Sequence, residues 1–198
     1  TLQPVVQNRY VPSNNTAALG SGAIFLGVHG PFYKSVKADV GVAFTGSGTA
    51  KFSGEVWQDA SPNFSNFTYN YKVDQFRIAF KARLVETEPM FLKAVKPYVS
   101  GEIGGGANHS SGYSTSRTID TAVLQPPFVN NTETALTYAF GIGLQGEVRP
   151  HVQVAVGYEF ADWGKNNLGL ANGQTTRDRL GSSNLYVNEL QFSILYTI

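Results

Sequence analysis

The side chains best suited to nucleophilic chemistry in this chain are a histidine and a serine that lie close together in the sequence. His109 and Ser111 are two residues apart, which puts both on one face of an extended strand. A serine beside a histidine base can hydrolyse an acyl bond when a carboxylate orients the histidine, and Glu133 is the acidic residue that would complete the set. The surrounding Asn, Ser, Gly and Thr residues equally fit the start of a polar loop, and we expect the loop.

Other catalytic chemistry has little support in the sequence. His29, His109 and His151 form no metal-ligand spacing, and the chain has no cysteine, so thiolate sites and disulfides are excluded. The glycines at 104–106 are not followed by the Lys-Ser/Thr of a phosphate loop. We therefore expect no enzyme activity, no cofactor and no metal.

Composition points away from two further classes. Charged residues are 15% of the 198, against about 25% in an average soluble domain. The net charge of +1 argues against a nucleic-acid partner, because such proteins usually carry a basic excess. No apolar run reaches the roughly 18 residues of a membrane-spanning helix.

Alternation of apolar and polar residues is the main structural signal, and it predicts strands. Eight segments carry it: 24–29, 36–45, 51–57, 75–84, 98–107, 134–148, 152–161 and 189–198. We predict an all-β antiparallel meander formed by residues 21–198, preceded by an arm, 1–20, outside the sheet. Short connections (46–48, 86–97, 149–151) belong to one end and long polar ones (59–66, 110–133, 163–183) to the other, with 31–35 as the exception.

The two faces of the predicted strands allow two interpretations. In a soluble lipocalin-like barrel the apolar face points inward, whereas in a membrane barrel it faces lipid. We favour the membrane barrel, because the polar face carries mostly Gly, Ala, Ser and Thr, which suit a crowded interior. The predicted lipid-facing residues are Phe76, Ile78, Phe80, Leu136, Phe140, Ile142, Val154, Val156, Phe192 and Ile194. The predicted aromatic girdle is Tyr138, Tyr158, Phe160, Trp163 and Tyr196.

Charged residues on the opposite face form the candidate site. They are Lys37, Asp39, Lys51, Glu55, Arg77, Lys81, Arg83, Glu102, Glu147, Glu159 and Glu189. Because an eight-stranded barrel has room only for side chains, we expect an ion-pair network that plugs the lumen, with a narrow ion pore as the alternative. We place Glu102 opposite Ala79, within reach of Arg77 and Lys81. Glu159 and Glu189 would be neighbours that need a cation from across the lumen.

Three stretches resemble the small outer-membrane barrels of Gram-negative bacteria, in particular the opacity-protein and outer membrane protein A- or X-like family. They are TYAFGIGLQGEVRPHVQVAVGYEFADWGKNNLG, LYVNELQFSILYTI and KPYVSGEIGGGAN. Gln191, Ser193, Tyr196 and Ile198 stand at the positions of the family's C-terminal assembly signal, with Ser193 in place of Gly and Ile198 in place of Phe.

The resemblance implies an eight-stranded, up-and-down transmembrane barrel with a removed signal peptide and periplasmic termini, the arm included. It implies contact with outer-membrane lipid and lipopolysaccharide, insertion by the barrel-assembly machinery, and a monomer. The expected role is structural, or adhesion and host contact through the long loops, with Trp163 and Tyr113 as exposed anchors. The His109–Ser111 pair also resembles that of lipid A deacylases, which are small barrels too, and a deacylase is the enzymatic alternative.

Overall fold

The computed structural model describes residues 8–13, 16–88, 95–123 and 126–196, and almost all of its regular structure is β-strand. None of the described residues forms a helix long and apolar enough to cross a membrane. The elements are β1 (Arg9–Pro12), β2 (Ser21–Tyr33), β3 (Val36–Ser47), β4 (Ala50–Trp57), the 3-10 turns η1 (Gln58–Ala60) and η2 (Pro62–Phe64), β5 (Ser65–Glu86), β6 (Val95–Arg117), β7 (Asn131–Arg149), β8 (Val152–Asp162), β9 (Asn166–Asn167), β10 (Gly181–Ser182) and β11 (Tyr186–Tyr196).

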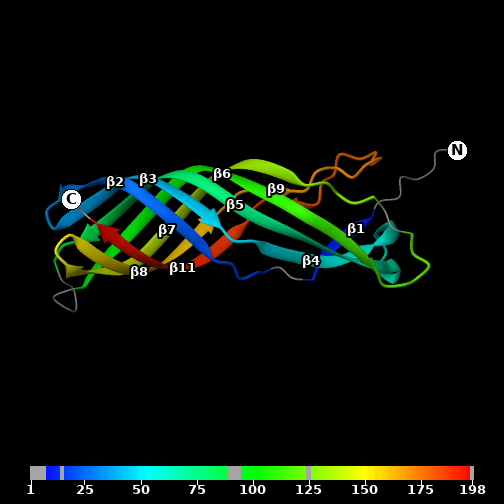
Figure 1. Ribbon diagram of the computed structural model, residues 1–198, viewed down its shortest axis with the longest axis horizontal. Helices are drawn as coiled ribbons and strands as arrows, with labels where there is room; N and C mark the ends of the chain where they lie inside the picture. The colour runs from blue at the N-terminus through cyan, green and yellow to red at the C-terminus, as the bar shows by residue number, and fades with distance from the viewer. Residues whose placement is uncertain (1–7, 14–15, 89–94, 124–125, 197–198) are drawn as a thin grey trace.

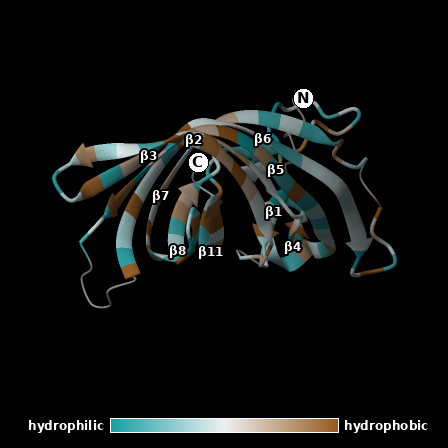
Figure 2. Cartoon of the chain, turned by 60° about the vertical axis from the view of Figure 1, so that its left-hand side comes forward, coloured by the Kyte–Doolittle hydropathy of each residue, from teal (hydrophilic) through white to brown (hydrophobic). Residues whose placement is uncertain are grey.

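Nine of the strands form one antiparallel sheet that curls into a half-barrel (Figures 1 and 2). The order across the wall is β2-β3-β5-β6-β7-β8-β11, and β1 and β4 extend it at one end. The prediction of an all-β antiparallel sheet is thus confirmed, and each of the eight alternating segments lies in a strand over its described residues.

The connectivity of β3 and β4 differs from the predicted meander. Residues 46–48 do not reverse the chain. β3 pairs with the part of β5 that runs from Phe76, opposite Gly46, to Glu86, and β4 pairs with the part of the same strand that runs from Ser65 to Val73. β5 has 22 residues, so its edge is long enough to take both. β1 and β2 follow each other in the same way along β4 and β3. The segments 36–45 and 51–57, predicted as two neighbouring strands, therefore share one position beside β5, and the wall is seven strands wide.

This arrangement also explains the one connection that did not fit the predicted alternation. The short link at 34–35 joins β2 to β3 at the same end as the links from β5 to β6 and from β7 to β8, which we call the turn end. The long connections after β4, β6 and β8 gather at the opposite, loop end. Arg9–Pro12, part of the predicted arm, pairs with Gly54–Trp57 of β4 at the loop end.

The polarity of the sheet reverses along the length of β5. In the turn-end half, the concave face holds Gln75, Arg77 and Arg83, which are buried, and the convex face exposes Phe76, Ile78 and Phe80. In the loop-end half, the concave face holds Phe67, Tyr69, Tyr71 and Val73, all buried, and the convex face exposes the polar Thr68, Asn70 and Lys72. The turn-end half is therefore apolar outside, whereas the loop-end half has the polarity of an ordinary soluble sheet.

The predicted apolar face is the exposed one. All ten residues predicted to face lipid are exposed, among them Phe80 at 54%, Ile142 at 62% and Val156 at 42%, while Arg77 is only 2% exposed. The alternation had therefore assigned the two faces of the turn-end half correctly.

Aromatic rings fill the loop-end half. Tyr69 stacks on Tyr71 and on Tyr113, and Tyr10 and Phe128 close the cluster edge-on. Burial raises the pKa of Tyr69 to about 12, so its phenol stays neutral. Tyr113, predicted to be an exposed anchor, instead packs within this cluster, which is a correction: its strand position faces the concave side here.

We expect Phe67→Ala to destabilise the protein by about 3–5 kcal/mol, because it leaves a cavity beneath the aromatic cluster. The free energy of unfolding, measured by denaturant titration, tests this. Thr68→Ala, one residue away on the exposed face, is the control and should change stability by less than about 0.5 kcal/mol. Equal losses in the two variants would show that the polarity assignment of this half is wrong.

Candidate functional site

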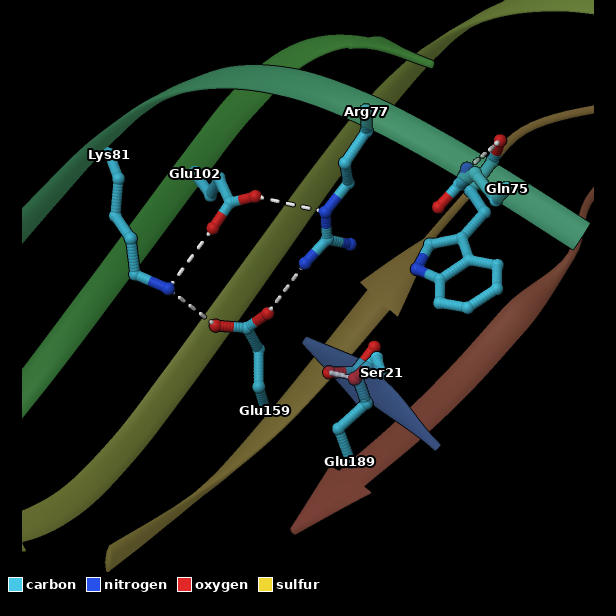
Figure 3. A network of polar contacts seen from close by, with 8 residues as sticks. Ser21, Gln75, Arg77, Lys81, Glu102, Glu159 and Glu189 are labelled. Atoms are coloured by element: carbon cyan, nitrogen blue, oxygen red, sulfur yellow. Dashed lines mark hydrogen bonds and ion pairs between the residues drawn. The ribbon is translucent and has the colours of Figure 1, made fainter. Parts of the chain in front are cut away.

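Four charged side chains form a closed ring on the concave face (Figure 3). Arg77 Nε lies 3.1 Å from Glu102 Oε1, and Arg77 Nη2 lies 3.1 Å from Glu159 Oε1. Lys81 Nζ lies 3.1 Å from Glu102 Oε2 and from Glu159 Oε2. Each cation thus touches both carboxylates, and the ring is neutral as a whole.

Strand register brings the four groups together. Arg77 and Lys81 are four residues apart on β5, so both point inward with Ala79 between them. Lys81 pairs directly with Glu102 on β6, and Ala79 pairs with Gly104. Glu159 reaches the ring from β8, beyond Ala139 and Gly141 of β7. The small residues leave the space that the long side chains fill, as the sequence predicted.

The predicted register was wrong by two residues, although the predicted contacts are correct. Glu102 lies opposite Lys81 and not Ala79. A shift of two keeps every side chain on its face, and long side chains still meet diagonally, so the ion pairs form in either register. The neighbourhood of Glu159 and Glu189 is confirmed, because the two residues are register partners.

Burial makes this ring energetically demanding. The side chains of Arg77, Glu102 and Glu159 are 2%, 3% and 1% exposed, and that of Lys81 is 12% exposed. Removing such charges from water costs several kcal/mol per ion, which only close pairing offsets. Loss of one member would leave its partners buried and uncompensated.

Further layers lie on either side of the ring. Towards the turn end, the Arg83 guanidinium lies 4.4 Å from the centre of the Tyr98 ring and donates to Gln145. A Cβ at Gly143 or Gly157 would collide with Tyr98, so these glycines make room for the ring to lie over β7 and β8 on the concave face. Towards the loop end, Gln75 and Asn108 donate to the backbone oxygen of Trp163.

Trp163 was predicted to lie in the exposed girdle, and this is wrong. It is 1% exposed, and its ring centre lies 6.0 Å from the Arg77 guanidinium carbon. Trp163 follows β8, where the chain turns inward at Gly164 with φ +75°. Trp163 is four residues beyond Glu159 and shares its strand parity, so the alternation itself indicates the concave face, and the girdle assignment departed from it. Tyr98 likewise shares strand parity with Glu102, which indicated its inward position.

The remaining charges predicted to face the lumen lie only partly on the concave face. Asp39 accepts from His29 at 2.6 Å, and Glu189 accepts from Ser21 at 3.3 Å. Lys37 and Glu147 are exposed near the turn end. Lys51 and Glu55 are exposed on the convex face of β4, which corrects their assignment to the lumen. The cause is the break between β3 and β4: Thr45 and Ala50 both face inward although their separation is odd.

The exposed carboxylate of Glu55 has local partners instead. The Ser65 hydroxyl and the Trp57 indole N–H donate to Oε2 at 2.8 Å and 3.3 Å. These hydrogen bonds lower the pKa of the Glu55 carboxyl, with the bond from Ser65 contributing most.

The predicted girdle and assembly-signal residues are divided between the two faces of the sheet. Tyr138, Tyr158 and Tyr196 are exposed at 36%, 47% and 72%, and Phe160 stacks half-buried on Tyr186. In β11, Gln191 and Ser193 are half-buried on the concave side. Ile198 lies outside the described residues.

The geometry does not assemble a hydrolase site around His109. His109 Nδ1 lies 3.0 Å from Thr132 Oγ1, whereas Glu133 is bound by Lys165 at 3.1 Å and Arg179 at 2.8 Å. Thr132 and Glu133 are consecutive on β7 and so point to opposite faces. Ser111 is register partner of Lys72 on β5. No group of three metal-ligating side chains occurs in the part of the chain that the structure describes.

Comparison of the chain with protein-family models, curated proteins and solved structures finds no match.

Removing the Arg77 charge should destabilise the protein by about 3–5 kcal/mol, since Glu102 and Glu159 lose half of their pairing. Arg77→Leu in a denaturant titration measures this. The matched control is Lys37→Leu, because Lys37 is exposed and outside the ring, and its effect should stay within about 0.5 kcal/mol. A neutral Arg77→Leu would mean that the ring contributes nothing to stability.

Proposed function

We propose that the protein is a bacterial outer-membrane β-barrel whose turn-end half spans the lipid and whose loop-end half projects outside the cell. Its role is structural or adhesive, exercised through the loops that the barrel displays. The observation that carries this proposal is the reversal of polarity along β5, with Phe76, Ile78 and Phe80 on the outer surface of one half and Thr68 and Lys72 on that of the other.

The reversal is difficult to account for in water. Strand β11 exposes Phe192 at 79% and Ile194 at 81%, and β7 exposes Leu136 at 69% and Phe140 at 65%. Water disfavours such a continuous apolar surface, whereas acyl chains favour it. A lipocalin-like ligand binder requires the apolar residues to line the interior, so the exposed face counts against that alternative.

A plugged lumen is favoured over an ion pore. The ring of Arg77, Lys81, Glu102 and Glu159 crosses the interior from β5 and β6 to β8. Trp163 lies next to it on the loop-end side, and Tyr98 on the turn-end side. Ions passing through would have to displace these paired charges.

The loop end is the candidate contact surface. Its elements are held to the barrel by ion pairs, since Lys165 and Arg179 both bind Glu133. Loops on a rigid scaffold commonly carry binding. The lipid A deacylase alternative has less support, because Glu133 is engaged by these cations and points away from His109.

The membrane location is tested by placing a cation on each half of the same face of β5. Ile78→Lys should destabilise the barrel in lipid vesicles by about 2–4 kcal/mol, because it puts a charge into hydrocarbon. Thr68→Lys should have almost no effect, because Thr68 would lie outside the bilayer. The measurement is denaturant unfolding followed by heat-modifiable gel migration. Equal effects, or a wild-type protein that stays monodisperse without detergent, would contradict the proposal.

Recordings in planar bilayers separate plug from pore. We expect the wild-type protein to give no steady conductance steps. The double variant Arg77→Ala/Glu159→Ala removes one cation and one anion of the ring, so it keeps the charge balance while opening space, and it should give such steps. Reproducible steps from the wild-type protein would favour the pore instead.

A further inference from the structure

The two edges of the half-barrel, β2 and β11, have no ladder partner on their outer sides among the residues that the structure describes. A cleft of about 1040 Å³ lies between them, lined by residues of β2 and by Glu189–Tyr196 of β11. It opens onto the concave face, where Arg77, Lys81 and Arg83 also line it. Side chains next to the cleft are among the most exposed in the sheet, with Val28 at 74% and Ile194 at 81%. Unpaired strand edges of this kind do not persist in a lipid bilayer, because their backbone groups would lack hydrogen bonds.

The direction of the two edges limits how the gap can close. Six antiparallel pairings lead from β2 through β3, β5, β6, β7 and β8 to β11, so β2 and β11 run in the same direction. Direct closure would therefore need a parallel ladder in an otherwise antiparallel wall. One additional strand between them would be antiparallel to both, and the wall would then have an even number of strands.

The contacts across the cleft are made by side chains alone. The Ser21 hydroxyl donates to Glu189 Oε2 at 3.3 Å, with the long glutamate reaching from β11 (Figure 3). No backbone pairing accompanies this contact in the described part of either strand. A strand inserted here needs about 10 Å between the two backbones, which is two ladder spacings.

Charge indicates what the missing strand should carry. Glu159 has two cationic partners in the ring, whereas its register partner Glu189 forms no ion pair with a cation among the described residues and has the Ser21 and Gln191 side chains as polar neighbours. Glu189 Oε1 is buried without a hydrogen-bond partner. A lysine or arginine facing inward from the inserted strand would pair with Glu189. The outward positions would be apolar, to continue the surface formed by Leu26 and Phe192.

The connectivity indicates the source of the strand. β1 enters the sheet at the loop end, where Arg9 pairs with Trp57. A segment joined to β1 through a hairpin at that end would run antiparallel to β1 and β2 and would lie in the cleft beside β11. We propose that the cleft takes one further strand of the same polypeptide, N-terminal to these 198 residues, with alternating apolar residues outward and a Lys or Arg opposite Glu189. This inference rests on the proposed membrane barrel.

The first experiment measures the gap in the cysteine-free chain. The pair Ala23→Cys/Gln191→Cys places one thiol on each edge, and Ser193→Cys/Ala155→Cys is the control, because Ser193 and Ala155 are register partners. Under oxidation the control should form an intramolecular disulfide, and the test pair should not. A bismaleimide of about 10 Å should link the test pair. A rapid intramolecular disulfide in the test pair would show direct closure and overturn the inference, and a disulfide-linked dimer would show that a second copy closes the gap.

The second experiment adds the proposed strand to the protein as a separate peptide. The probe is a synthetic peptide of about 11 residues that alternates Val or Leu with Gly or Ser and carries one inward Lys; the control peptide carries Glu in its place. In detergent the Lys peptide should bind at least about tenfold more tightly than the Glu peptide, and Glu189→Gln should abolish the difference. Glu147→Gln, on the exposed surface, should leave the difference unchanged.

The source is tested by joining the Lys strand to the N-terminus through a flexible loop. The linked strand should block the bismaleimide reaction at any protein concentration, whereas the free peptide should do so only in excess. Equal binding of both peptides, or no protection by the linked strand, overturns the inference. Neither result bears on the membrane proposal, which fails separately if Ile78→Lys and Thr68→Lys behave alike.

Discussion

The buried ring of Arg77, Lys81, Glu102 and Glu159 is the interaction on which the rest of the structure depends. Four ionised side chains on the concave face cost several kcal/mol each unless every one is paired. The four groups come from β5, β6 and β8, so their pairing requires these strands to curl towards one another. The curvature of the sheet is therefore what allows the ring to be neutral. The neighbouring concave-face positions are Ala and Gly residues, because larger side chains there would occupy the space that the charged side chains fill.

A consequence of this polar interior is that the apolar side chains of the same strands must face outward. The arrangement holds only as far as the ring and its adjoining layers extend. Beyond Gln75 the concave face becomes aromatic, with Phe67, Tyr69 and Tyr71, and the convex face becomes polar. One continuous strand of 22 residues therefore passes through two different environments. Its pairing with β6 shifts register between Asn70 and Lys72, close to the point where the polarity changes.

The length of β5 also determines the width of the wall. Because its edge accommodates β3 and β4 one after the other, the chain uses two alternating segments to build one strand position. This leaves β2 and β11 running in the same direction at the two edges. The buried and partly unpartnered carboxylate of Glu189 lies at one of these edges, where the ladder stops.

The sequence by itself determined which residues of the turn-end half face inward and outward, because alternation with a period of two is a local property of extended chain. It indicated the ring as well, since parity places Arg77, Lys81 and Glu102 on one face and a register error of two residues preserves that face. Only the tertiary structure decided that β3 and β4 share one strand position, because a break with an odd spacing looks like a hairpin turn in the sequence. It likewise decided that Lys51 and Glu55 point away from the concave face. These outcomes depend on which strand lies alongside, and no local pattern encodes that choice.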